Sequence, residues 1–170
     1  LLDAGYNLST KVNLVFVDSE ELNSKNSTEL LSNLQGIVVP DGRGESGLDG
    51  KKIAAEYARN NNIPFLGIGL GLEVLVTDII YSIRKKSFLT PDKPIFMPKN
   101  KRRSGASDIY LKEGSLAREI YENKEKIKER HKYDYEFNSE YIDALEEIGV
   151  KFSGFSKEGL VEIIEYTKND

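Results

Sequence analysis

The sequence predicts an α/β fold in which a mostly parallel sheet is flanked by helices, with an antiparallel hairpin near the C-terminus. Two short apolar runs, 35–40 and 64–69, are each followed by a segment with the character of a helix. Strand, helix, strand, helix in succession implies right-handed crossovers and parallel strands. Near the end, residues 150–166 hold two strand-like runs joined by the turn sequence SKEG, which is typical of a hairpin.

The first half supplies the parallel part of this prediction. Alternation over Lys11–Val17 predicts a strand, and Asp18, three residues before Glu21, predicts the cap of a short helix. The run 35–40 reads as a buried parallel strand that Pro40 ends. Residues 48–64 and 71–86 are expected to be helices, the second one apolar nearly all round.

The second half is less regular. Residues 87–107 contain three prolines and a basic run, and we expect a long loop there. A short strand follows, and then Ser115 is expected to cap a helix that continues to about Lys128. A second late helix is expected between Asn138, its cap, and Gly149, its stop.

Composition excludes several classes of protein. The chain has 170 residues, about one domain, and a formal net charge of −4, which argues against a nucleic-acid partner. It has no cysteine, so it has no disulfide, thiolate zinc site or cysteine nucleophile. We expect no metal site, because no His and carboxylate group has metal-ligand spacing. No apolar run suggests a membrane span or signal peptide. We expect a cytoplasmic protein, and its start at Leu1 suggests a piece of a longer chain.

The glycine-rich turn PFLGIGLGLEVL, residues 64–75, is the main candidate for chemistry. Its spacing is G-x-G-x-G, whereas a dinucleotide fingerprint needs G-x-G-x-x-G and a P-loop needs a following lysine. A nucleophile elbow would use Gly67 and Gly71 to make room for a strained residue between them. That apex residue is Gly69, which has no side chain. From the residues alone, a damaged elbow and a plain strand–helix turn both stay open.

Several stretches carry a family resemblance in the same order along the chain. They are GIVVPDGRGESGLDGKKIAAEYARNNN, IPFLGIGLGLE, YLKEGSLAREIY, KERHKYDYEFNSEYIDALEEIG and VKFSGFSKEGLVEIIE. Together they resemble the class I glutamine amidotransferase domain of CTP synthase, which implies a flavodoxin-like fold and a single domain over residues 1–170. In that family the domain hydrolyses glutamine and passes ammonia to a synthetase domain, which uses ATP and Mg²⁺ to aminate UTP. The resemblance implies this synthetase domain as a partner, in the same or another chain, a homo-oligomeric parent, and no cofactor in this domain.

The same resemblance implies a degenerate active site. Gly69 stands where the family has the cysteine nucleophile, and its His and Glu partners normally follow the final hairpin, beyond Asp170. Backbone amides of Gly42 and Leu70 match the oxyanion hole. Asp41 replaces one of two glycines there, and a carboxylate would repel the developing negative charge.

Substrate-binding positions are changed as well. Glu73 matches a glutamine that touches substrate, and Asp134 an arginine that pairs with the glutamine carboxylate, so weaker binding of L-glutamine is expected. Arg103 matches an arginine of the loop associated with an allosteric GTP response, although a solvated basic loop is the simpler interpretation. His131 is expected to be a packed or surface histidine rather than a base.

Three hypotheses follow from these changes. The first is a pseudoenzyme with a scaffold or regulatory role, because a designed change at Gly69 would leave Asp41, Glu73 and Asp134 unexplained. The second is a working amidotransferase that was silenced by design. The third is an unrelated flavodoxin-like binder, which would carry a tightly bound cofactor. Glycine at a strained elbow also relieves about 1–3 kcal/mol of backbone strain, so the fold can outlast the chemistry.

Overall fold

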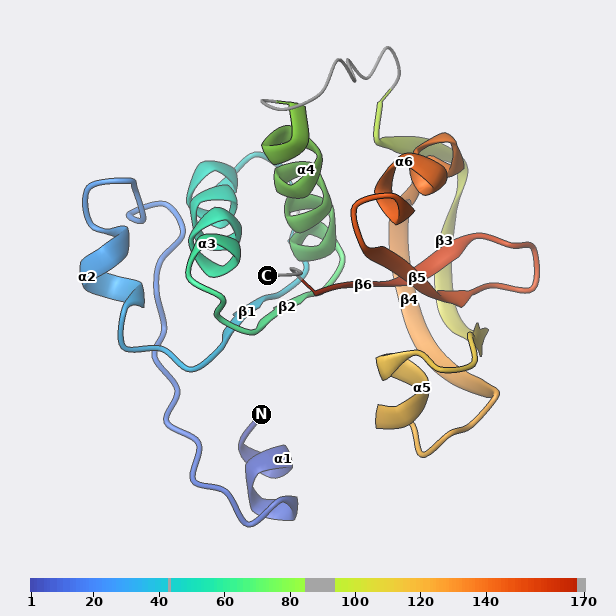
Figure 1. Ribbon diagram of the computed structural model, residues 1–170, viewed down its shortest axis with the longest axis horizontal. Coiled ribbons are helices and arrows are strands. Elements are labelled where there is room, and N and C mark those ends of the chain that lie inside the picture. Colours follow the sequence, from blue (N-terminus) through green and yellow to red (C-terminus); the bar gives the residue numbers. More distant parts are fainter. Residues whose placement is uncertain (43, 85–93, 168–170) are drawn as a thin grey trace.

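The computed structural model describes residues 1–42, 44–84 and 94–167 (Figure 1). It contains a two-stranded parallel sheet, β1–β2, and a four-stranded antiparallel sheet in the order β4-β3-β5-β6. Helix α4, Leu70–Arg84, packs against α3 and the parallel strands and also against the antiparallel sheet. The predicted fold class is confirmed by this mixture of elements and by the structural neighbours reported below.

The parallel part follows the expected strand–helix–strand order. Strand β1, Ile37–Val39, pairs in parallel with β2, Phe65–Gly67, and α3, Leu48–Asn60, connects them. Ile37 and Val39 of β1 face inward and pack with Ala54 and Ala58 of α3. Small alanines on α3 let the helix lie close to the strand, so the prediction for residues 35–64 is confirmed.

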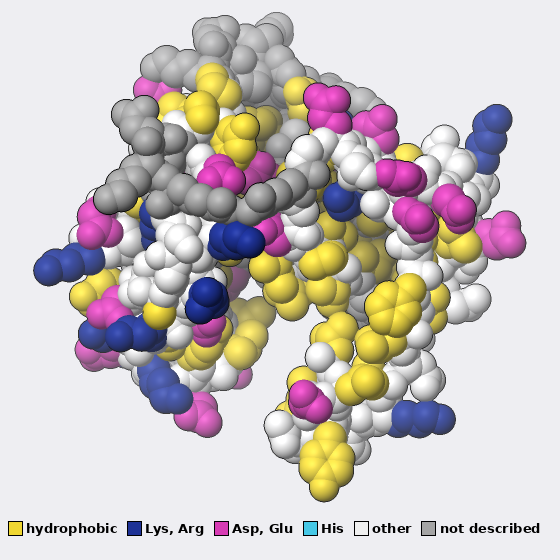
Figure 2. Space-filling view, turned by 180° about the vertical axis from the view of Figure 1, so that it is seen from behind, with side chains coloured by type: hydrophobic (Ala, Val, Ile, Leu, Met, Phe, Trp, Pro, Cys, Tyr) yellow, Lys and Arg dark blue, Asp and Glu magenta, His cyan; other side chains and the backbone are white. Residues whose placement is uncertain are grey.

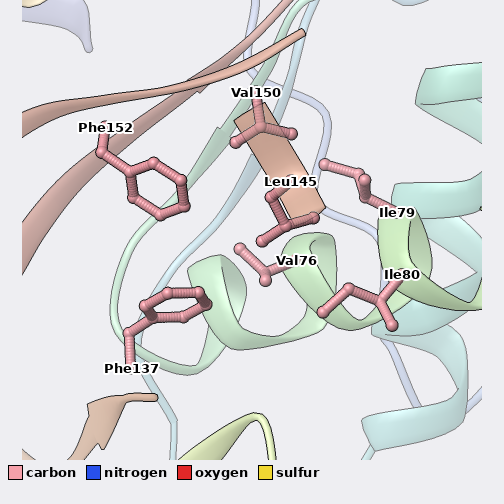
Figure 3. Close-up of a cluster of buried hydrophobic side chains, with 7 residues drawn as sticks. All are labelled: Val76, Ile79, Ile80, Phe137, Leu145, Val150 and Phe152. Atoms are coloured by element: carbon pink, nitrogen blue, oxygen red, sulfur yellow. The ribbon is translucent and has the colours of Figure 1, made fainter. Parts of the chain in front are cut away.

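Helix α4 is apolar nearly all round because it is covered on two sides. On its far side from α3, Val76, Ile79 and Ile80 meet side chains of the antiparallel sheet and of α6 (Figure 3). That cluster is completed by Phe137, Leu145, Val150 and Phe152. A helix with two apolar faces is stable only between two layers, which is the position of α4.

The antiparallel sheet is larger than the predicted hairpin. Its strands are β3, Phe96–Leu111; β4, Lys126–Phe137; β5, Val150–Phe155; and β6, Val161–Tyr166. Strands β5 and β6 form the hairpin that the sequence predicts. In the described part of the chain, parallel pairing is limited to β1 and β2, so the sheet is not mostly parallel there.

The loop predicted over residues 87–107 is wrong for its second part. From Phe96 onward the chain is β3, and residues from Phe96 to Tyr110 pair with β4 across a register shift between Pro98 and Arg103. The pairing partners of residues 96–107 lie from 22 (Ser107 with Glu129) to 41 (Phe96 with Phe137) residues further along the chain, which the prolines and lysines of the segment itself cannot reveal. Residues 87–93 lie outside the described residues.

The helix predicted from Ser115 to Lys128 is also too long. Ser115 does cap a helix, since its hydroxyl accepts a hydrogen bond from the Arg118 amide at 3.1 Å, but α5 is only Leu116–Ile120. Glu122 and Asn123 have positive φ angles of 57° and 60°, which end the helix and turn the chain into β4.

The second late helix is confirmed with its cap. Asn138 accepts a hydrogen bond from the Glu140 amide at the start of a 3₁₀ turn, η1, Ser139–Tyr141. Helix α6, Ile142–Glu146, follows, and Gly149 with φ of 90° ends the turn after it.

The strand predicted over Lys11–Val17 is absent, because these residues pair with no strand of the described chain. Asp18 accepts a hydrogen bond from the Glu20 amide at 2.9 Å, yet it caps a turn rather than a helix. Helix α1, Leu2–Asn7, precedes this segment and was not predicted from the sequence. Helix α2, Ser27–Leu31, follows it. A strand needs a ladder partner, and alternation alone does not supply one.

Part of the surface is apolar. Phe16 is 92% exposed, Val15 62% and Leu66 of β2 53%. Figure 2 shows hydrophobic side chains gathered on one face, around a hollow and on a projecting lobe. Among the described residues, no helix is long and apolar enough to span a bilayer.

Candidate functional site

The glycine turn joins β2 to α4 in an elbow. Strand β2 ends at Gly67, α4 begins at Leu70, and Gly69 between them has a φ of +56°. The amide of Glu73 donates to the Gly69 carbonyl at 3.1 Å, which closes the first helical turn. The sequence-predicted strand–turn–helix is therefore confirmed, with the apex residue in the left-handed region.

The outer glycines are required by close backbone approach. A Cβ on Gly67 would lie 2.5 Å from the carbonyl carbon of Gly71. A Cβ on Gly71 would collide with the carbonyl oxygen of Val39 in β1. The elbow therefore presses the start of α4 directly onto both parallel strands, which a side chain at either position would prevent.

Asp41 occupies the space above the elbow. Its Oδ1 accepts a hydrogen bond from the Leu70 amide at 3.1 Å, and a Cβ built on Gly69 would lie only 2.6 Å from the Asp41 Cγ. The carboxylate thus stands where a side chain of residue 69 would project. Gly42 lies beside it, where a Cβ would meet the Leu70 side chain and the Lys51 ammonium at 3.2 Å each.

A small cavity of about 50 Å³ lies beside Gly69, between the start of α4 and the antiparallel sheet. Its wall brings together Gly69, Glu73 and Arg103 from the set that the sequence analysis singled out. Asp134 is not among the lining residues that the structure describes. Its neighbours Tyr133 and Tyr135 line the cavity, whereas the Asp134 side chain is exposed. The full lining is Gly69, Leu72, Glu73, Phe96, Arg103, Tyr133, Tyr135, Glu136, Phe137, Leu160, Val161, Glu162 and Ile164.

Carboxylates dominate the electrostatics of this cavity. Burial raises the pKa of Glu73, and the charge of Asp41 raises it further. Burial also raises the pKa of the Tyr133 hydroxyl, followed by the charges of Asp41 and Glu162, while Arg103 acts in the opposite direction. Both shifts mean that a further negative charge is unfavourable beside Gly69.

Arg103 belongs to a buried ion pair rather than to a solvated loop. Its guanidinium pairs with Glu162 of β6, and its Nη2 lies 2.8 Å from Nδ1 of His131 on β4. The side chains of Glu162 and His131 are each 4% exposed. His131 is therefore packed inside, as predicted, and the allosteric role of Arg103 stays a prediction. The side chains of the neighbouring residues 99–102, KNKR, lie outside the described set.

Glu162 lines the cavity and is not among the site residues that the sequence predicts. It precedes two isoleucines in the strand VEIIEY. A carboxylate in a hairpin strand is ordinarily expected to face the solvent. A signal that could have found it is the presence of charged or polar residues inside other strands. Arg103 and His131 are such residues, and they could pair with Glu162. Among the described residues, no group of three or more His, Cys, Asp or Glu is placed to hold a metal ion.

A family model matches almost the whole chain. The model for glutamine amidotransferase class-I matches residues 1–169. The chain belongs to this family.

Within the amidotransferases, the chain is similar in sequence to CTP synthases. The chain is 40% identical to CTP synthase of Staphylococcus epidermidis over 188 aligned positions, which cover 100% of this chain and 35% of that protein. It is 39% identical to CTP synthase of Bacillus subtilis, over 97% of this chain and 34% of that protein. The chain therefore spans about a third of the length of these curated relatives.

Solved structures agree with the amidotransferase fold. A Trypanosoma brucei CTPS glutaminase domain with bound acivicin matches with a TM-score of 0.83 and 28% identity, over 95% of this chain and 70% of that one. A glutamine amidotransferase from Thermotoga maritima matches with a TM-score of 0.65 and 15% identity, over 96% of this chain and 64% of that one. The second likeness shows the fold alone.

Proposed function

We propose that this chain is the glutamine amidotransferase domain of a CTP synthase-type protein and that it has lost the glutaminase step. The CTP synthase relatives and the glutaminase-domain structure support the first part. One observation carries the second part, namely that the Asp41 carboxylate fills the place of a side chain at Gly69.

The chemistry of amide transfer explains why this arrangement is inactive. Covalent hydrolysis of glutamine needs a nucleophilic side chain at the elbow, and glycine offers none. It also needs amide donors for the oxyanion, and the Leu70 amide already donates to Asp41. The carboxylates of Asp41 and Glu73 further disfavour an incoming anionic substrate group beside Gly69.

A role in binding remains for such a domain. In the proposed whole protein, a synthetase domain in the same or another chain aminates UTP to CTP with ATP, Mg²⁺ and free ammonia, and this chain acts as its scaffold or regulatory partner. Figure 2 shows hydrophobic side chains gathered on one face, which supports this role, since large exposed apolar patches are typical of protein–protein contacts. Homo-oligomerisation and a cytoplasmic location belong to the same proposal.

A glutaminase assay tests the proposal. We expect the purified chain to release no glutamate from L-glutamine above the buffer background, with an active class I amidotransferase assayed in parallel. We also expect no mass increase after incubation with acivicin, measured by intact-protein mass spectrometry. Glutamate release that scales with the concentration of this chain would overturn the loss of activity.

A further inference from the structure

Strand β4 is an outer strand of the antiparallel sheet. The order β4-β3-β5-β6 leaves one edge of β4 without a partner strand in the described chain, over the length Lys126–Phe137. The other outer strand, β6, is half-buried along its whole length, so it is less accessible. An open edge of a long strand offers backbone N–H and C=O groups with which a second peptide backbone can pair.

Cations occupy alternate positions along this strand. Four exposed basic side chains form what we call the basic row: Lys126, Lys128, Arg130 and Lys132. Ile127 and His131 between them are only 7% and 3% exposed. Pairing with β3 is regular over this part of β4. Because side chains alternate between the two faces of a regular strand, the four cations share one face and repeat at about 7 Å.

The basic row is short of counter-charges. Lys126 lies 2.9 Å from the carboxylate of Asp108 on β3. The other three cations form no ion pair with the residues that the structure describes. Opposite Arg130 and Lys132, β3 presents the small uncharged residues Ala106 and Ser104. This face of the β3–β4 pair is therefore low, and its positive charge is largely uncompensated.

We infer that the open edge of β4 binds an acidic peptide segment, which adds to the sheet as an extended strand and directs its carboxylates at the basic row. Alternate side chains of such a strand repeat at the spacing of the basic row, and opposite charges on neighbouring strands attract. Cations on the edge disfavour neutral or basic strands, so charge makes the edge selective.

The open backbone favours a peptide over a nucleic acid as the occupant. A polynucleotide can meet the cations, but it has no backbone that completes a β ladder. The net charge of −4 also disfavours general binding of polyanions. The inference goes beyond the proposed loss of glutaminase activity and does not depend on it, because no residue of the basic row lines the cavity beside Gly69.

A synthetic peptide provides the test. The probe is a short peptide of alternating Glu and Val with blocked ends and a fluorescein label, and fluorescence anisotropy reports its binding to the unaltered chain. We expect saturable binding at about 50 mM NaCl that weakens at about 300 mM, because salt screens exposed charges. A peptide of alternating Lys and Val should not bind. Absence of saturable binding of the acidic peptide up to about 1 mM would overturn the inference.

Charge removal tests the basic row. The combined variant Lys128→Gln, Arg130→Gln and Lys132→Gln should raise the dissociation constant of the acidic peptide about tenfold, because three favourable cross-strand pairs are lost. All three side chains are exposed, so the variant should fold, and its urea midpoint checks this.

A matched control separates the basic row from net charge. Lys11→Gln, Lys25→Gln and Lys52→Gln remove the same number of charges from exposed positions in the first half of the chain. We expect this variant to bind the acidic peptide nearly as tightly as the unaltered chain. Equal losses of affinity in the two triple variants would overturn the assignment to the basic row.

Backbone pairing has its own readouts. A fully N-methylated form of the acidic peptide keeps the carboxylates and loses the amide donors, so it should bind at least about tenfold more weakly. The unmethylated peptide should slow amide hydrogen exchange in β4 and leave β6 unchanged. Equal affinity of the methylated form would overturn strand addition. Tighter binding of oligouridylate than of the acidic peptide would overturn the peptide as occupant and favour a nucleic acid.

Discussion

The guanidinium of Arg59 on α3 holds the carboxylate of Asp78 on α4 through two contacts, Nε to Oδ2 at 2.6 Å and Nη2 to Oδ1 at 3.2 Å. The two side chains are 15% and 12% exposed. This hydrogen bond is the main cause that raises the pKa of Arg59. The pair joins the two helices that follow β1 and β2.

Removal of the Asp78 carboxylate should therefore lower the free energy of unfolding. We expect Asp78→Ala to lower the free energy of unfolding by about 1–3 kcal/mol, because the part-buried Arg59 guanidinium would keep only the Asn60 side chain as a hydrogen-bond partner. Urea denaturation measures this. The control is Asp49→Ala, which breaks the exposed pair with Lys52 and should cost below about 1 kcal/mol. Equal losses in the two variants would contradict the prediction.

Glu73 should make stability depend on pH. Its folded-state pKa is raised above the ordinary value of 4.5 by burial and by Asp41. The stability that protonated Glu73 contributes is complete below 4.5 and is lost as the pH rises through the raised value. We expect Glu73→Gln to be more stable than the unaltered protein at pH 7, with the difference vanishing below pH 4.5, in urea unfolding at both pH values.

The variant Asp41→Asn tests whether the charge of Asp41 contributes to the raised pKa of Glu73. In Asp41→Asn the charge that adds to the shift of Glu73 is gone, so the stabilisation by Glu73→Gln at pH 7 should shrink. If the stabilisation by Glu73→Gln did not shrink, burial alone would account for the raised pKa of Glu73.

The buried pair of Arg103 and Glu162 predicts another large effect. Glu162→Gln should lower the free energy of unfolding by about 1–3 kcal/mol, because the guanidinium of Arg103, which is 21% exposed, would lose its charged partner. The matched control is Glu125→Gln, whose side chain is 86% exposed and lies 3.8 Å from Arg118. Chemical denaturation followed by tyrosine fluorescence compares them, and a similar small loss in both would contradict the buried pairing.

Glu165 caps α5 from a strand. Its two carboxylate oxygens accept hydrogen bonds from the amides of Leu116 at 3.2 Å and Ala117 at 2.7 Å. We expect Glu165→Ala to cost about 1–2 kcal/mol and to speed hydrogen exchange at these two amides. Glu29→Ala on the distant α2 should leave both exchange rates unchanged. Unaltered protection at Ala117 in Glu165→Ala would rule out the cap.

Local signals predicted the elements that have clear end signals or that follow a standard strand–helix–strand crossover. The parallel pair around Ile37 and Phe65 was predicted from apolar runs, and Ser115 and Asn138 were predicted as caps from residue type and spacing. Each depends on hydrogen bonds within a few residues or on a standard crossover. The resemblance carried by the glycine turn also predicted the family, which the family model confirms.

Two predictions about strands were wrong, because a strand forms only where another strand is available to pair with it. Residues from Phe96 to Ser107 read as a loop and are a strand, because β4 supplies a ladder that lies further along the chain. Lys11–Val17 reads as a strand and is unpaired in the described chain. Strand formation is decided by the availability of a partner edge, and alternation reports only the faces that a strand would have.

The sequence by itself determined the class of fold, the glycine frame of the elbow and the absence of a nucleophile at Gly69, because these depend on residue identity and short spacing. Only the tertiary structure decided what fills the elbow. The parallel register of β1 and β2 brings Asp41 to the amide of Leu70, and strand pairing buries Arg103 against Glu162. Both are contacts between residues far apart in the chain, so packing and not local propensity sets them.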